Sequence, residues 1–293
     1  MFSTAPPPAA TAPQAPFRHA VELDPSGHGD ARTIADALAM VEDGGVIYVR
    51  PGRYRGSLQI TKPVTIVGSR MAGDQPVFES MTINTAGDVR LEAIEIESAG
   101  ELSALRIDGG EVSLVDCTIT ASALGRDNGS MTGAITATGG DIQISGGAIG
   151  PGGDAAVLAY GTANVTIVRG ARIDGRAGYG LFATSRARLS VSDSRISGRI
   201  AAATHQQARI SLRGNTVIGT PAESVLVVNG NAPSDITGNR IFVLLNGELA
   251  GASSHNWLRR APNASQLTGD DNFSGDSNRE LSLAPGGPRR RRS

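Results

Sequence analysis

Residues 112–119 read VSLVDCTI, and the same pattern returns as IQISGGAI at 142–149, LSVSDSRI at 189–196 and ISLRGNTV at 210–217. Each copy starts with an apolar-polar-apolar alternation, continues with small or polar residues and ends on an apolar residue. Alternation with a period of two is typical of a β-strand with one buried face. Small and polar residues between two such runs mark a tight corner. The pattern therefore predicts two short strands joined at a corner, repeated along the chain.

The repeat can be followed from one apolar strand residue, called the anchor here, to an Ile or Val five positions later. The pairs are Leu91/Ile96, Leu114/Ile119, Ile144/Ile149, Val168/Ile173, Val191/Ile196, Leu212/Val217 and Ile236/Ile241. Successive anchors are 23, 30, 24, 23, 21 and 24 residues apart. A recurrent spacing near 23 is typical of a solenoid, and three short strands with three corners fill a coil of this length. The sequence therefore predicts an all-β parallel solenoid whose coils stack at about 4.8 Å.

The composition agrees with such a fold. Aromatic residues make up only 4% of the chain and glycine occurs 38 times, so the core is expected to consist of Ile, Val, Leu and Ala. The formal net charge is −1, which argues against a nucleic-acid partner. Cys117 is the single cysteine, so no intrachain disulfide can form, and we expect it to be a core residue.

A short helix is predicted ahead of the first coils, in the segment GDARTIADALAMVED at 29–43. Its apolar residues recur at helical spacing: Ile34, Ala37, Leu38 and Val41. Thr33 or Asp30 is the candidate N-cap, and Gly44-Gly45 is predicted to end the helix. An open coil end exposes unpaired strand edges, so this helix is expected to cap the solenoid.

The stretch ARTIADALAMVEDGGVIYVRPGRYRGSLQITKPVTIVGS, residues 31–69, resembles the opening coils of the pectin-lyase-like superfamily, above all pectin methylesterases and right-handed β-helix repeat proteins. The resemblance implies a right-handed parallel β-helix with an N-terminal capping α-helix. The family's catalytic motifs are not found: the Gly-x-x-Asp-Phe and Asp-Phe-Ile-Phe-Gly segments of the esterases and the Asp-His-Pro-Arg motif of mannuronan epimerases are missing. Fold likeness alone does not carry an activity.

Three segments are expected along the chain. Residues 1–20 are a Pro/Ala-rich linker expected to be disordered, 21–247 form the β-helix, and 248–293 are an irregular or disordered tail. A linker at this place suggests a fused upstream domain. No stretch has the features of a signal peptide or a transmembrane segment, so we expect no membrane partner and, if the chain is complete, a cytoplasmic location.

Equivalent positions in successive coils form columns, which turn the repeat into a map of candidate sites. Three positions before the anchors lie Asp88, Glu111 and Asp141, an acidic column, and the same column later holds Arg188 and Arg209. Stacked carboxylates repel unless they are solvated or share a cation. We expect no cofactor and no metal, with a calcium site at Asp88, Glu111 and Asp141 as the alternative.

Arginines dominate other columns of the C-terminal half. Arg172, Arg195 and Arg240 lie four positions after their anchors, and Arg169 and Arg213 lie one position after theirs. Together they predict a basic strip suited to acidic polysaccharide or to the carboxylates of a protein partner. The 30-residue spacing predicts a projecting loop at 121–133 with the polar tip Arg126, Asp127 and Asn128. Ser194, Asn215 and Asn239, three positions after their anchors, are predicted to form a structural ladder at a corner.

Three functions remain open. The first is a non-catalytic binding or scaffold module that recognises a protein partner or an acidic glycan, which fits the missing catalytic motifs. The second is a carbohydrate-active enzyme, a polysaccharide lyase, epimerase or esterase, for which the catalytic residues are unknown. The third is an assembly protein whose coil ends stack, and the oligomeric state is unknown. An enzyme should show carboxylates, or a carboxylate with Arg or His, converging in one groove.

Overall fold

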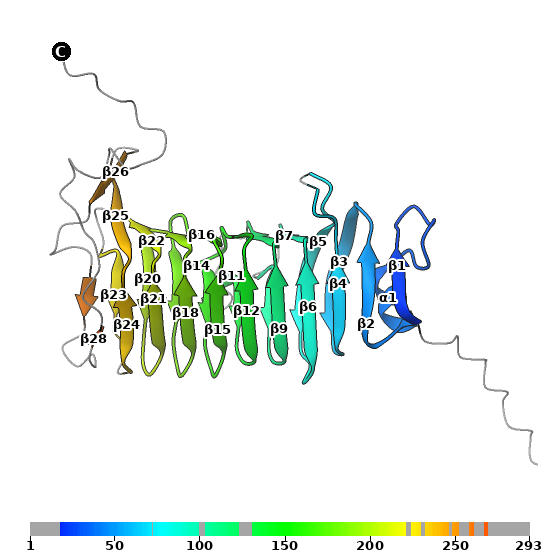
Figure 1. Ribbon diagram of the computed structural model, residues 1–293, viewed down its shortest axis with the longest axis horizontal. Coiled ribbons are helices and arrows are strands. Elements are labelled where there is room, and N and C mark those ends of the chain that lie inside the picture. Colours follow the sequence, from blue (N-terminus) through cyan, green and yellow to red (C-terminus); the bar gives the residue numbers. More distant parts are fainter. Residues whose placement is uncertain are drawn as a thin grey trace, which may run out of the picture.

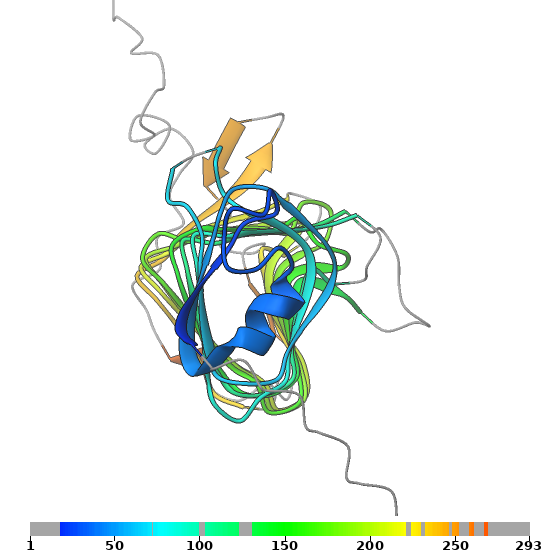
Figure 2. The same ribbon diagram turned by 90° about the vertical axis from the view of Figure 1, so that its right-hand side faces the viewer.

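The computed structural model describes residues 18–71, 73–99, 103–122, 131–220, 224–229, 232–245, 248–251, 258–260 and 267–268. Over these residues the chain forms an elongated stack of parallel strands, with helix α1 at one end (Figure 1). Viewed along the stack, successive coils superpose as one closed outline (Figure 2). The predicted all-β parallel solenoid is confirmed.

From residue 88 onward, each coil contributes one strand to each of three faces. Face A is an eleven-stranded sheet. Its strands, in order along the stack, are β1 (Arg18–Leu23), β2 (Val41–Val49), β4 (Val64–Val67), β6 (Asp88–Glu92), β9 (Glu111–Val115), β12 (Asp141–Ser145), β15 (Asn164–Val168), β18 (Arg188–Ser192), β21 (Arg209–Arg213), β24 (Ser234–Thr237) and β28 (Leu267–Thr268).

Faces B and C follow face A in each coil. Face B contains β7 (Glu95–Ser98), β10 (Thr118–Ala121), β13 (Ala148–Ile149), β16 (Arg172–Asp174), β19 (Arg195–Ser197), β22 (Thr216–Gly219) and β25 (Arg240–Leu245). Face C contains β8 (Leu105–Ile107), β11 (Gly133–Ala137), β14 (Ala155–Ala159), β17 (Tyr179–Ala183), β20 (Ile200–Thr204), β23 (Leu226–Val228) and β27 (Leu258–Arg260). Strands β3 (Arg53–Ile60) and β5 (Val77–Ile83) join the two faces into one sheet, because β5 pairs with both β7 and β8.

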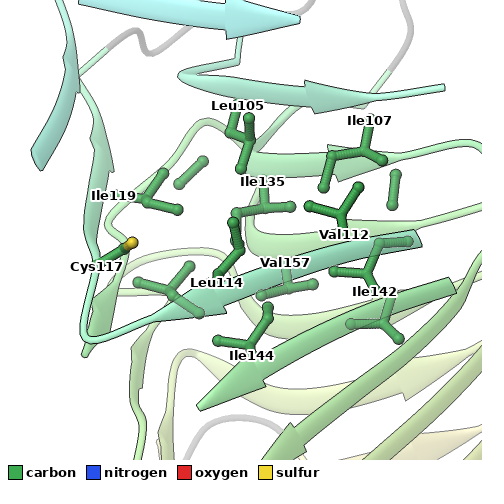
Figure 3. Packing of buried hydrophobic residues seen from close by; sticks show 14 of the residues in the cluster. Leu105, Ile107, Val112, Leu114, Cys117, Ile119, Ile135, Ile142, Ile144 and Val157 are labelled. Atoms are coloured by element: carbon green, nitrogen blue, oxygen red, sulfur yellow. The ribbon is translucent and has the colours of Figure 1, made fainter. Parts of the chain in front are cut away.

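The core is a continuous column of aliphatic side chains from all three faces. Figure 3 shows one section, in which Leu114 and Ile144 of face A meet Ile119 of face B and Ile135 and Val157 of face C. All five are buried. The strands of faces A and B alternate buried and more exposed residues, as the period of two predicts. Burial of apolar surface, at about 25 cal/mol per Å², is therefore the main stabilising contribution.

Neighbouring coils are in register, which confirms six of the seven anchors. Leu91, Leu114 and Ile144 pair in succession, as do Val191, Leu212 and Ile236. The anchor Val168 is wrong, because Ile144 pairs with Ile167, and Ile167 in turn pairs with Val191. Val168 itself lies opposite Ser145.

An extra residue at one corner explains this error. Three residues, 169–171, separate the face A strand from the face B strand in this coil, whereas the coils on either side have two residues there. Arg169 and Gly170 absorb the insertion with φ angles of 63° and 75°. The register of face B is unchanged, because Ala148, Arg172 and Arg195 still pair in succession.

The N-terminal helix is present but shorter than predicted. Helix α1 spans Ile34–Met40, and Thr33 is its N-cap, with the Asp36 amide donating to the Thr33 hydroxyl at 3.2 Å. Asp30 is not the N-cap. Its carboxylate instead accepts from the amide of Glu22 at 2.9 Å.

Gly44-Gly45 does not end the helix either, because β2 begins at Val41 and contains both glycines. Val41 is fully buried with extended backbone angles, and burial of this β-branched side chain in the sheet outweighs its helical spacing. The helix lies across the opening of the first coil, with Ala37 buried (Figure 2). That it protects this end of the stack remains a prediction.

Strands also occur near the expected segment boundaries. Strand β1 begins at Arg18, within the residues expected to form the linker. In the C-terminal segment, β26 (Glu248–Gly251) pairs antiparallel with β25, while β27 and β28 extend faces C and A. No helix among the described residues combines the length and the apolar character needed to cross a membrane.

Face C differs from the other two faces because its strands after β8 are largely apolar on both sides. Every residue of β11, β14 and β20 is buried. The outward residues form a second apolar cluster that is separate from the core: Ala155, Leu158, Phe182, Ile200, Ala203 and Val227. Met131, Tyr160 and Tyr179 pack against this cluster and are partly buried. Apolar surface therefore continues from the outside of face C toward its edge with face B.

Candidate functional site

The predicted asparagine ladder is present at the corner between faces A and B. The Asn215 side chain donates to the Val191 carbonyl at 2.9 Å and to Asn239 Oδ1 at 3.0 Å, and its Oδ1 accepts from the Ser194 amide at 3.0 Å. Asn239 in turn donates to the Leu212 carbonyl at 2.8 Å. All three ladder residues are buried, so their polar groups are used within the fold.

Cys117 occupies the same corner position in an earlier coil. Burial raises the pKa of the Cys117 thiol to about 11. A reactive cysteine needs a lowered pKa and access to solvent, and this thiol has neither. The expectation that Cys117 is a core residue is confirmed.

The predicted acidic column is also present on face A. Asp88, Glu111 and Asp141 pair in succession, and the column continues through Asn164 to Arg188 and Arg209. The acidic half lines a shallow depression of about 420 Å³. No three His, Cys, Asp or Glu residues within the described ranges come together as a group that could hold a metal ion. The geometry therefore does not favour the calcium alternative, and the expectation that no metal binds stays a prediction.

The predicted arginine column forms on face B. Arg172 pairs with Arg195, Thr216 follows, and Arg240 comes next. The three arginines are exposed, and none of them forms an ion pair with a described residue. Two exposed like charges directly opposite each other destabilise a sheet. The Arg172–Arg195 pair therefore favours an external anion.

The two remaining arginines do not join this column. Arg169 is the extra residue at the corner, so it does not share a column with Arg213, which pairs with Ser192 instead. Arg213 forms an ion pair with Asp235, with Nε at 2.9 Å and Nη2 at 2.5 Å from Oδ2. The Thr237 hydroxyl, together with Arg213, holds the pKa of Asp235 below its usual value. The predicted strip thus reduces to Arg172, Arg195 and Arg240, with Arg169 at its side.

A second pair of arginines was missed by the sequence analysis. The segments 172–176 and 195–199 both read Arg-Ile-x-Gly-Arg, in neighbouring coils. Arg176 and Arg199 follow the face B strands and line a groove. The Arg199 side chain is fixed by the preceding coil, because its Nε donates to the Ala177 carbonyl at 3.1 Å. The repeated motif was a usable signal that both arginines follow a face B strand, but it does not place them side by side. Four residues, 175–178, precede face C in the first coil and only two, 198–199, in the second, so the Arg199 amide donates to the Gly178 carbonyl at 2.9 Å.

The groove has a volume of about 820 Å³ and lies between faces B and C. Its lining residues are Glu97, Ser98, Thr120, Ala121, Ser122, Met131, Pro151, Gly152, Gly153, Asp154, Gly175, Arg176, Ala177, Gly178, Tyr179 and Arg199. Tyr179 comes from the apolar cluster outside face C, and its ring contacts Phe182 edge-on at a centroid distance of 4.9 Å. The groove therefore combines cations, carboxylates and one aromatic wall.

Glycines form part of this lining for a steric reason. A Cβ atom on Gly152 would lie 2.1 Å from the backbone nitrogen of Ala134, and one on Gly178 would lie 2.2 Å from the carbonyl oxygen of Asp154. No other residue fits these positions without moving the backbone of a neighbouring coil. The glycines therefore allow the main chains of neighbouring coils to approach closely at this edge of the groove.

The projecting loop was predicted at 121–133. Its polar tip, Arg126, Asp127 and Asn128, lies outside the described residues. The flanks of the loop are described, and Ala121, Ser122 and Met131 all line the groove. The prediction that this segment could wall a groove therefore agrees with the position of its flanks.

The carboxylates of the groove already have partners within the chain. Glu97 accepts from Arg53 Nη2 at 2.7 Å, and Asp154 accepts from the Thr132 amide at 3.1 Å. These contacts hold the side chains in place. The sequence analysis did not single out either residue, because both lie beside irregular connections and outside the charged columns.

Comparison with known proteins gives one family. Residues 81–241, more than half of the chain, match the family described as the right handed beta helix region. No curated protein matches. One similar solved structure is a pectin methylesterase from carrot, with 13% sequence identity, a TM-score of 0.37, and coverage of 92% of this chain and 89% of that chain. On the family match, this chain belongs to the right-handed β-helix family.

Proposed function

We propose that this chain is a non-catalytic binding module for an acidic glycan, held in the groove between faces B and C. The carrying observation is the four-arginine array made by the repeated Arg-Ile-x-Gly-Arg motif. Arg176 and Arg199 line the groove, and Arg172 and Arg195 stand on the adjoining face without a described carboxylate partner. Guanidinium groups pair with carboxylates and sulfates through two parallel hydrogen bonds, so they suit a regularly charged polymer.

The shape and lining of the groove support a sugar chain over a compact ligand. Ligand sites combine apolar walls with a few placed polar groups, and Tyr179 and Met131 supply such a wall here. Arg172 and Arg195 lie opposite each other on adjacent strands, about 4.8 Å apart along the stack, so successive charged groups of a polymer can be matched there.

The intrachain contacts of the two groove carboxylates, Glu97 and Asp154, support a non-catalytic role for the groove. Glu97 is neutralised by Arg53, and Asp154 is engaged by the Thr132 amide. A general acid or base needs a side chain free to exchange a proton with the substrate. The structural contacts of these two residues favour roles in shaping the groove.

Glycan binding is tested with an array of uronate-containing, sulfated and neutral polysaccharides, followed by titration of the best ligand. We expect binding only to acidic polymers, with an affinity that falls steeply as salt is raised. The double substitution Arg172→Gln and Arg195→Gln should weaken binding by about tenfold or more. The matched control, Arg32→Gln with Arg55→Gln, removes two exposed arginines near helix α1, away from faces A and B of the later coils, and should leave affinity unchanged. Equal loss in both variants, or equal binding of neutral glycans, contradicts the proposal.

A second candidate is a carbohydrate-active enzyme, because Glu97 and Asp154 line the same groove. The bound acidic polymers are incubated with the protein and assayed for unsaturated uronides and for new reducing ends. Product that disappears in Glu97→Gln or Asp154→Asn would replace the non-catalytic proposal with this one. If no acidic glycan binds and the chain instead captures a protein through Arg172 and Arg195, the partner is a protein, and both the glycan-binding and the enzyme proposals are overturned.

A further inference from the structure

Face A carries three columns of outward side chains that run along the stack, on strands that lie side by side in Figure 1. The first column is Asp88, Glu111, Asp141, Asn164, Arg188 and Arg209. The second is Arg90, Ser113, Gln143, Thr166, Ser190 and Ser211. The third holds Glu92, Val115, Ser145, Val168, Ser192 and Arg213. The middle column is mostly short and polar, so the face is flat enough for another surface to approach.

Charge is divided sharply along the first column. Its three acidic residues come first and its two arginines last, with Asn164 between them, where its Nδ2 donates to Asp141 Oδ1 at 2.8 Å. Asp88, Glu111, Arg188 and Arg209 are exposed, and none of them forms an ion pair with another described residue. Like charges directly opposite each other on adjacent strands are destabilising. Each half of the column therefore lacks an opposite charge that the other half possesses.

The basic end of this column also borders a hollow. Arg186, Arg188, Gln207 and Arg209, with Ala232 and Pro233, line a depression of about 380 Å³. The acidic end lines the depression of about 420 Å³ already described. Two concave regions of opposite charge thus lie on one face, at opposite ends of a single row.

We propose that face A is a docking surface for a second copy of this chain, packed antiparallel about a twofold axis that runs parallel to the strands between β12 and β15. Reversal of the column places Asp88 opposite Arg209 of the partner subunit, and Glu111 opposite Arg188 of the partner subunit. Asp141 meets Asn164 of the partner subunit at the axis. Both halves of the column then gain the opposite charge at once, as an isologous interface requires.

The other two columns are compatible with this arrangement. In the middle column, Ser113 meets Ser190 of the partner subunit, and Gln143 meets Thr166 of the partner subunit. In the third column, Glu92 meets Arg213 of the partner subunit, although each keeps its own intrachain partners, Arg70 and Arg90 for Glu92 and Asp235 for Arg213. No like charges come opposite each other in any of the three columns, and such complementarity specifies one partner and one register.

The parallel arrangement of two copies fails the same test. A twofold axis along the stack would bring the first column against the third. Asp88 would then face Glu92 of the partner subunit, and Arg209 would face Arg213 of the partner subunit. Glu92 is already paired with Arg70 and Arg90, and Arg213 with Asp235, within their own chain. The parallel arrangement therefore gives the unpaired charges of the first column no opposite charge, and it is disfavoured.

The size of the surface sets the strength of the interaction. Eight strands, from β4 to β24, at about 4.8 Å each and about 17 Å wide give roughly 600 Å² per copy, or roughly 1,200 Å² in total. This lies at the lower limit of specific interfaces. The dimer is therefore expected to be reversible, to depend on concentration and to weaken as salt screens the charges.

Sedimentation velocity of the full chain over about a hundredfold range of concentration tests the proposal, at low salt and at about 0.5 M NaCl. We expect a dimer at low salt that dissociates at high salt. Reversal of the basic end, Arg188→Glu with Arg209→Glu, should raise the dimer dissociation constant by at least about tenfold. The control Arg172→Glu with Arg195→Glu reverses two arginines of face B and should dimerise like the unmodified chain.

A mixing experiment separates a specific interface from damage to the fold. Asp88→Arg with Glu111→Arg makes the column basic at both ends, and Arg188→Glu with Arg209→Glu makes it acidic at both ends. Neither variant should dimerise alone, whereas their mixture should form a heterodimer, with circular dichroism checking each fold. A chain that is monomeric at every concentration in low salt overturns the proposal, as does a dimer broken by the face B reversal only, or no recovery on mixing. These readouts do not depend on glycan binding, so the two proposals can fail separately.

Discussion

The corner between faces A and B is built in two different ways along the same molecule. In the C-terminal half the inward corner residues are Ser194, Asn215 and Asn239, joined by hydrogen bonds from coil to coil. In the N-terminal half the equivalent residues are Ile94, Cys117, Gly147 and Ala171, which make no such ladder. Both halves keep the same register of the flanking strands.

This difference shows that a residue at the corner must fill the space there and leave the nearby backbone groups hydrogen-bonded. More than one residue type can do so. Asparagine meets both requirements with its amide, which reaches the carbonyl of the preceding coil. Ile94 fills the space with apolar atoms, and Cys117 fills it with a thiol that donates to the Leu91 carbonyl of the preceding coil at 3.4 Å. Gly147 meets it with no side chain, because the backbone of Cys117 already occupies the position.

The largest effect is expected from removal of the central amide of the ladder. Asn215→Ala leaves the Ser194 amide and the Val191 carbonyl without their partner, in a place that water does not reach. Buried polar groups left unpaired destabilise by about 1–3 kcal/mol each, so we expect a loss of about 3 kcal/mol in the free energy of unfolding. Urea unfolding measures it. Asn84→Ala, at an exposed position, is the control and should stay within about 0.5 kcal/mol. Equal effects would mean that the ladder contributes nothing.

The next effect distinguishes close packing from backbone strain in the N-terminal half. Gly147 and Gly170 have nearly equal φ angles, 76° and 75°, but only Gly147 is crowded, since a Cβ there would lie 2.1 Å from the Cys117 carbonyl oxygen. Gly170→Ala should cost about 1 kcal/mol, from the left-handed backbone alone. Gly147→Ala should cost about 3 kcal/mol, because the neighbouring coil must shift as well. Thermal or urea unfolding of the pair gives the difference. Equal stabilities of the two variants would show that a Cβ atom at Gly147 is accommodated without displacing the neighbouring coil.

The smallest effect concerns the thiol of Cys117. In the unfolded chain it ionises near its ordinary pKa of 9.0, and in the fold near 11. At neutral pH both states hold the proton, so Cys117→Ser should change the pH dependence of stability very little there. As the pH rises from about 9 toward 11 the unfolded thiol loses its proton first, and stability should fall in the unmodified chain relative to Cys117→Ser.

Thiol labelling supplies an independent reading of the same site. At pH 8 to 9 the native thiol should react at least about a hundredfold more slowly than the thiol of the denatured chain, because labelling requires opening of the stack. Rapid labelling of the native protein would show that the corner at Cys117 opens to solvent.

The amino-acid sequence predicts the periodic features of this fold, the columns and the ladder, but it does not predict the irregular corners. Asp88, Glu111 and Asp141 were placed in one column because each stands three positions before an anchor, and the ladder at Asn215 and Asn239 followed from the same counting. The offset of Arg169 could not be counted in this way, since Ile167 and Val168 are equally apolar and either one fits an alternating strand. Only the pairing of the coils distinguishes them.

The groove was harder to predict for a different reason. Its members lie between strands, where no period holds, and the position of Asp154 or Tyr179 depends on how closely the glycines allow neighbouring coils to approach. The end of helix α1 shows the same limit, because burial of Val41 against the sheet decided it and local spacing did not. Long-range packing therefore set both outcomes.

The inserted residue at Arg169 has a consequence for how this molecule can vary over time. One additional amino acid was accommodated between two strands, and every strand beyond it kept its alignment. A corner of this kind acts as a tolerance point at which a single-codon insertion or deletion is neutral for the architecture, whereas the same change inside a strand would turn its core residues outward. Length differences among descendants of this sequence should therefore accumulate at the corners, and sequence alignments that penalise gaps uniformly will misplace them.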